Sequence, residues 1–118
     1  MSVITVVFVL SGLLMVALAI PMIRCKVPPN PWYGFRIPLT LKNPKIWYAV
    51  NAYFGRLLRF IGFVTIGMAL LCPLIPGITV DGYAALITAS MVVSLLLAVV
   101  LGLLYAKSLD TSGGNSAP

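Results

Sequence analysis

Five residues in and just before the start of the second hydrophobic segment stand at short, fixed spacings, and four of them have hydrogen-bonding side chains. They are Asn30, Gly34, Arg36, Trp47 and Asn51. Amide, guanidinium and indole groups offer many N–H donors, which can satisfy backbone carbonyls or hold an anion. The glycine stands two residues before the arginine, and we expect it to adopt a positive φ that turns the arginine side chain inward. The pattern predicts a polar cluster, which either caps the fold or binds a ligand.

The same composition argues against an enzyme. The sequence contains no His, and Asp and Glu together number only two. These two acids, Asp81 and Asp110, lie outside the most apolar segments, so the chain offers no general acid–base pair and no Ser–His nucleophile. Without His there is also no convincing set of metal ligands. We therefore predict no catalytic residue, no metal and no cofactor.

The hydrophobicity of the chain indicates the class of protein in which this cluster lies. Of the 118 residues, 61% are hydrophobic and 8% are charged, whereas about 25% are charged in an ordinary soluble domain. Helices of about 20 apolar residues cross a bilayer, and the sequence predicts them at residues 3–23, 46–75 and 83–105. The prediction is an all-α membrane protein with three transmembrane helices. We expect one domain over residues 1–109 and a disordered polar tail over 110–118.

A proline-rich, basic connection separates the first two predicted helices. Five of the nine prolines fall between residues 24 and 45, which predicts a stiff, irregular loop. Because Arg24 and Lys26 follow the first apolar run, and no basic residue precedes it, we expect a retained helix and not a secretory signal. Basic residues concentrate in this loop and follow the last helix. By the positive-inside rule the loop and the C-terminus are cytoplasmic, and the N-terminus is outside.

Two arginines lie at the start of the second predicted helix. Arg56 and Arg59 are three residues apart and share a helix face. A cation within a bilayer is costly, so each must reach the interface or find a partner. We expect both to contact lipid phosphate or another anion, and pairing inside the protein is the alternative.

The last predicted helix carries small residues at every fourth position. They are Ser90, Ser94, Ala98 and Gly102. Small side chains on one face allow another helix to approach closely. The stripe predicts either packing inside the three-helix bundle or a seam between two copies of the chain.

A run of spacings between residues 30 and 55 resembles the signature of the SdpI family of bacterial membrane proteins, here in a short three-helix form. Its residues are Asn30, Gly34, Arg36, Thr40, Leu41, Trp47, Asn51 and Gly55. The namesake of this family is an immunity protein that protects a toxin-producing cell from its own secreted peptide. The resemblance implies a multi-pass protein of the bacterial cytoplasmic membrane that gives immunity to, or senses, a membrane-active peptide.

Two other functions remain open, an accessory small subunit of a larger membrane protein complex and an oligomeric channel or transporter. The expected partners are anionic lipid headgroups together with a toxin peptide, a larger membrane protein or a second copy of the chain. Nucleic acid is not expected, because the cations are held at a bilayer surface. In the immunity hypothesis, the peptide meets outer residues such as Asp81 and Tyr83, and the loop that contains Arg36 faces the cytoplasm.

Overall fold

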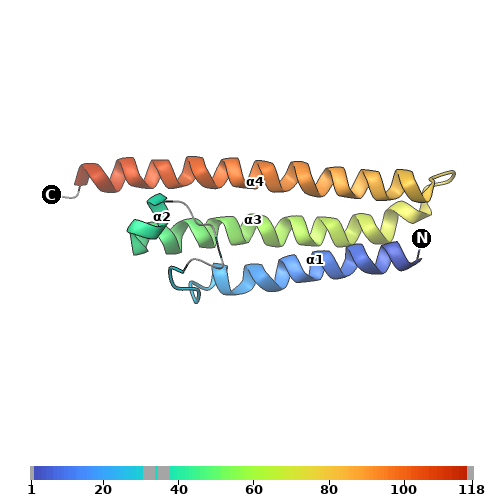
Figure 1. Cartoon of the computed structure of the whole chain (residues 1–118), viewed down its shortest axis with the longest axis horizontal. Helices are drawn as coiled ribbons and strands as arrows, with labels where there is room; N and C mark the ends of the chain where they lie inside the picture. Colours follow the sequence, from blue (N-terminus) through green and yellow to red (C-terminus); the bar gives the residue numbers. More distant parts are fainter. Residues whose placement is uncertain (1, 31–33, 35–37, 117–118) are drawn as a thin grey trace.

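The computed structural model describes residues 2–30, 34 and 38–116, and all regular structure in that part of the chain is helical. The elements in chain order are α1 (Ser2–Ile23), α2 (Pro38–Lys42), α3 (Pro44–Leu71), the short 3₁₀ helix η1 (Cys72–Leu74) and α4 (Val80–Ser116) (Figure 1). Three of them, α1, α3 with η1, and α4, are long and apolar enough to cross a membrane. The prediction of an all-α membrane protein is confirmed at this level.

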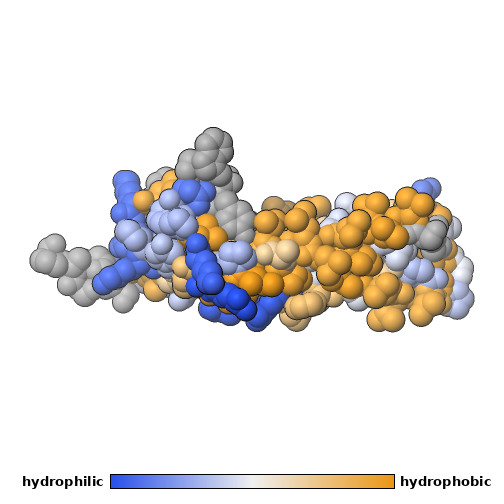
Figure 2. Space-filling view, turned by 90° about the horizontal axis from the view of Figure 1, so that it is seen from below, coloured by the Kyte–Doolittle hydropathy of each residue, from blue (hydrophilic) through white to orange (hydrophobic). Residues whose placement is uncertain are grey.

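Helix α3 lies between α1 and α4 and contacts both along its length (Figure 1). The C-terminal end of α4, α2 and the described residues of the loop after α1 lie at one end of the molecule, and the start of α1 and the α3–α4 connection lie at the other. We call the first of these the basic end, because hydrophilic side chains gather there while most of the remaining visible surface is hydrophobic (Figure 2). This arrangement puts the C-terminal end of α4 at the same end as the loop after α1, and the cytoplasmic location of that end stays a prediction.

Local sequence explains where α3 begins and where α1 ends. The Asn43 side chain accepts a hydrogen bond from the Lys45 backbone N–H at 3.0 Å, and Pro44 occupies the first turn of α3; both are strong start signals. At the end of α1, Cys25 adopts φ = 56°. The backbone N–H groups of Cys25 and Lys26 bond to the carbonyls of Met22 and Pro21, which is the hydrogen-bond pattern of a Schellman cap.

The last helix differs most from its predicted bounds. It begins at Val80, three residues earlier than expected, because the Thr79 hydroxyl accepts a hydrogen bond from the Gly82 N–H at 2.9 Å and caps the first turn. It also continues to Ser116, through the segment for which the sequence predicted disorder. No proline stands between Val80 and Ser116, and adding residues to an existing helix costs far less than starting one.

The α1–α3 interface is built on glycines that face each other. A Cβ on Gly62 would lie 2.7 Å from the Gly12 carbonyl oxygen, and a Cβ on Gly55 would lie 3.1 Å from the Ala19 carbonyl oxygen. The two contacts lie seven residues apart on each helix, and seven residues is the period of a left-handed supercoil. The two antiparallel helices therefore touch backbone to backbone at successive levels, and larger side chains would hold them apart.

Candidate functional site

Trp47 fixes the proline-rich loop to the helical bundle. Its side chain is fully buried on α3, and its indole N–H donates a hydrogen bond to the Val27 carbonyl at 2.7 Å. Val27 lies just after α1, twenty positions earlier in the chain. Removing this hydrogen bond lowers the stability of the fold, because the Val27 carbonyl would lose its buried donor. The residue thus ties the segment after α1 to the beginning of α3.

Gly34 packs directly on α3 in a conformation that suits glycine alone. Its φ is +108°, and an added Cβ would lie 2.5 Å from the Asn51 Oδ1 atom and 3.3 Å from two atoms of the Trp47 ring. The positive φ predicted for this glycine is confirmed. Arg36 lies outside the described residues, so its inward turn stays a prediction.

Asn51 completes the contact one helical turn beyond Trp47. It is 1% exposed, and its Nδ2 donates to the Trp47 carbonyl at 2.9 Å. Thr40, from α2, is also fully buried at this end. Within the described part of the chain, no buried side-chain polar atom is left without a hydrogen-bond partner. A satisfied network of this kind holds a single geometry.

Asn30 belongs to the loop side of the site. It is half-buried, and its Nδ2 donates to the Pro28 carbonyl at 2.7 Å. The structure thus brings Gly34, Trp47 and Asn51 into direct contact, and we call these three residues the Gly–Trp–Asn cap. Sequence reasoning missed the Val27 carbonyl, because a backbone acceptor leaves no signal in residue type.

The surface around the cap is positively charged. Exposed cations lie on several elements at the basic end: Arg24, Lys26, Lys42, Lys45 and Lys107. Among the described residues, no group of three or more His, Cys, Asp or Glu side chains could hold a metal ion. An ordered and cationic end of this kind can attract anionic lipid headgroups or acidic segments of a partner.

The two arginines predicted to contact lipid take different surroundings. Arg56 and Arg59 are both exposed on α3. Arg59 lines a groove between α1 and α3 together with Arg24, whereas Arg56 does not line it. The shared helix face predicted from their spacing does not give them the same neighbours.

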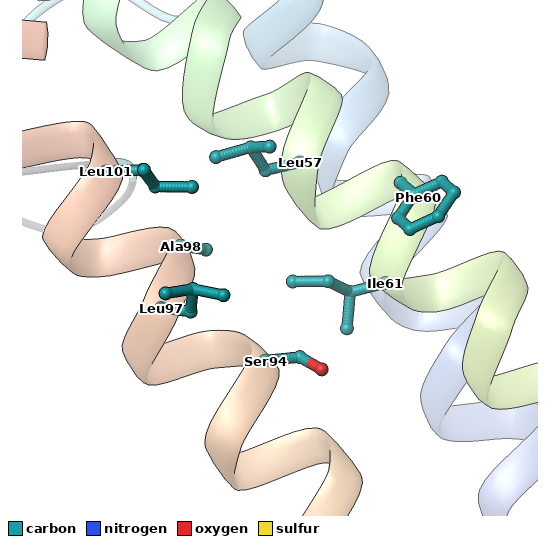
Figure 3. Close-up of a pocket in the computed structure, with 7 residues that line it drawn as sticks. All are labelled: Leu57, Phe60, Ile61, Ser94, Leu97, Ala98 and Leu101. Carbon is teal, nitrogen blue, oxygen red and sulfur yellow. The ribbon is translucent and has the colours of Figure 1, made fainter.

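The small-residue stripe of the last helix runs along its contact with α3. Ala98 is 2% exposed and clusters with Ile61, and the Ser90 hydroxyl lies 3.5 Å from the Met68 sulfur. Gly102 is buried as well. Ser94 projects from α4 into a pocket of about 210 Å³ between the two helices (Figure 3). These contacts favour packing within one chain at Ser90 and Ala98.

Tyr83 is not the outer contact residue that the immunity hypothesis assumed. Its side chain is fully buried, and its hydroxyl donates to the Ala69 carbonyl at 2.8 Å and lies 3.1 Å from the Thr5 hydroxyl. The ring also meets Phe8 edge to face. Tyr83 therefore joins the three spanning helices at the end opposite the cap, whereas Asp81 is exposed.

The fold and the site define a class of protein: a multi-pass membrane protein with three helices that can span the bilayer and a tightly packed cap at its basic end. The family model described as the SdpI/YfhL protein family matches residues 26–106, which is more than half of the chain. The chain belongs to the SdpI/YfhL family, and the resemblance found in the sequence is confirmed. No curated protein and no solved structure matches the chain. The matched segment contains the whole Gly–Trp–Asn cap, while α1 precedes it.

Proposed function

We propose that this chain is a non-enzymatic protein of the bacterial cytoplasmic membrane that gives immunity to, or senses, a membrane-active peptide. The observation that carries the proposal is the family match over residues 26–106, because the SdpI family is named for an immunity protein. The whole Gly–Trp–Asn cap lies inside this segment.

The structure supports a receptor-like function in a second way. The Gly–Trp–Asn cap couples the loop after α1 to α3 through buried contacts. At the far end, Tyr83 bonds to α3 and approaches α1. A peptide that bound at the outer end could therefore act on the basic end through one continuous helix, α3. We further propose that the basic end is cytoplasmic, as its cations require.

Growth protection tests this proposal. The full chain is expressed in a bacterial host that is sensitive to a panel of secreted membrane-active peptides, and the minimal inhibitory concentration of each peptide is measured. We expect a rise for at least one peptide. Gly34→Ala removes the protection, because the added Cβ meets Asn51 Oδ1 at 2.5 Å. Gly67→Ala keeps it, because a Cβ there meets nothing within 4 Å.

Membrane abundance of each variant is measured in the same cells. Loss of protection by a Gly34→Ala protein of normal abundance supports a role for the cap. If no peptide of the panel is tolerated better by cells with abundant wild-type protein, the immunity function is wrong for these peptides.

An accessory subunit is the second candidate, and the packing of α4 favours it. Only 11% of the residues in its most apolar window are buried, against 33% for the α3 span. Lipid can cover such a face, and so can a larger membrane protein. Gentle detergent extraction followed by mass spectrometry separates the two cases. A larger protein recovered in a one-to-one ratio would support the subunit, and recovery of the chain alone would count against it.

A further inference from the structure

A half-open groove lies between α1 and α3 near the basic end. Its volume is about 240 Å³, and it is lined by Val16, Ile20, Ile23, Arg24, Arg59 and Phe63. Four of these side chains are apolar and two are guanidinium groups, one from α3 and one from the residue that follows α1. The groove thus combines an apolar wall with two cations. The residue Arg24 precedes the segment matched by the family model, so the groove is built partly outside the family's shared region.

The packing of α1 against α3 explains how both arginines line one groove although their backbones lie at different depths. In the register set by the Gly12–Gly62 and Ala19–Gly55 contacts, the backbone of Arg59 lies about nine residues deeper than Arg24. This is roughly 13 Å along the helix. Helical side chains tilt toward the N-terminus of their own helix, which for α3 is the basic end. The Arg59 side chain therefore rises toward Arg24, and the hydrophobic part of both chains can lie along the wall.

The described residues offer these two cations no carboxylate. The acids of the chain are Asp81, at the opposite end, and Asp110, on α4, and neither lines the groove. A cation below the membrane interface is costly without a counter-charge. Guanidinium groups bind phosphate through forked pairs of hydrogen bonds. The most favourable counter-charge in this setting is a phosphate group that the membrane itself provides.

We propose that the groove binds one anionic phospholipid, with its phosphate between Arg24 and Arg59 and an acyl chain along Val16, Ile20 and Phe63. The apolar wall decides between a lipid and free phosphate, because an inorganic ion gains nothing from it. Phe63 is 57% exposed and Ile20 41%, so the wall is open to a chain arriving from the bilayer. A bound lipid covers this apolar surface and neutralises part of the charge of both arginines.

Lipid titration of the purified full chain tests the site. Native mass spectrometry in mild detergent measures the dissociation constants for phosphatidylglycerol and for phosphatidylcholine with the same acyl chains. We expect phosphatidylglycerol to bind about tenfold more tightly, and Arg24→Gln or Arg59→Gln to weaken it about tenfold. Arg56→Gln is the matched control, since Arg56 is an exposed arginine of the same helix that does not line the groove. This control keeps the affinity of the wild type.

Three results from the ligand comparison and the glutamine variants would overturn the proposal: equal affinity for the two lipids, equal loss in Arg56→Gln and Arg59→Gln, and inorganic phosphate that binds as tightly as the lipid. If a glutamine variant fails to fold, Arg59→Lys carries the test. It keeps the positive charge but loses the forked pair, so binding weakens if the guanidinium geometry matters. Unchanged binding in Arg59→Lys also overturns the assignment.

Discussion

Adding one methyl group to Gly62 tests whether the backbone contact between α1 and α3 stabilises the protein. A Cβ at this position would lie 2.7 Å from the Gly12 carbonyl oxygen, 2.8 Å from the Val16 Cγ2 atom and 3.3 Å from the Met15 Cβ. Two of these neighbours belong to backbone or to a stiff, β-branched side chain. Neither can rotate away, so the helices themselves must move apart.

The size of the effect follows from these distances. Carbon atoms attract best at about 3.5 to 4 Å, so the contact with the Val16 Cγ2 atom at 2.8 Å must lengthen by roughly 0.7 to 1.2 Å. Forcing an extra methyl group into a packed interface costs about 1 to 3 kcal/mol. Alanine also favours a helix over glycine, by up to about 1 kcal/mol. Gly67→Ala receives the same helix-propensity gain without the clash, because its Cβ meets nothing within 4 Å.

The free energy of unfolding in mixed detergent micelles is the quantity to measure for both variants. We expect Gly62→Ala to be less stable than Gly67→Ala by about 1 to 3 kcal/mol, with Gly67→Ala equal to or slightly more stable than the wild type. Equal stability of the two variants would refute the reasoning. It would mean that α1 and α3 shift past each other freely enough to absorb the methyl group.

Three further predictions concern the two ends of the bundle. Trp47→Phe removes the 2.7 Å hydrogen bond to the Val27 carbonyl; we expect a loss of about 1 to 3 kcal/mol and faster protease cleavage of the loop, and unchanged cleavage contradicts the anchoring role. Tyr83→Phe removes the bond to the α3 backbone and lowers the free energy of unfolding by about 0.5 to 2 kcal/mol, whereas wild-type stability would show that ring packing alone joins the helices. Cys25 is exposed at the basic end. If that end is cytoplasmic, a membrane-impermeant maleimide labels it in permeabilised cells only, and labelling of intact cells reverses the proposed orientation.

Much of the local architecture was predictable, because it depends on neighbouring residues. The long apolar runs predicted three spanning helices, and α1 ends at Ile23 as expected. The second span was placed at 46–75, and the helix with its 3₁₀ extension covers residues 44–74. The positive φ of Gly34 was expected, because glycine adopts this conformation without the steric cost of a Cβ atom. The start of α4 was missed although Thr79 offered a readable N-cap signal.

The candidate site was predicted only in part. Gly34, Trp47 and Asn51 are in contact, and the last two stand one helical turn apart, which the spacing shows; a role of these residues in binding stays a prediction. The acceptor of the Trp47 indole is a backbone carbonyl in a different segment, and every residue has such a carbonyl. The burial of Tyr83 was not predicted either, since a tyrosine near a helix start also suits a membrane interface.

By itself the sequence determined the class of the protein, the number of spanning helices and the family, since these depend on composition, hydropathy and fixed spacings along the chain. Only the tertiary structure decided which faces meet. It paired Gly12 with Gly62, placed Arg59 but not Arg56 in one groove with Arg24, and turned Tyr83 inward. The physical reason is that lipid tails are as apolar as leucine, so hydrophobicity does not orient a helix about its own axis inside a membrane. Close packing of small residues and a few hydrogen bonds set that rotation, and they exist only once the helices are together.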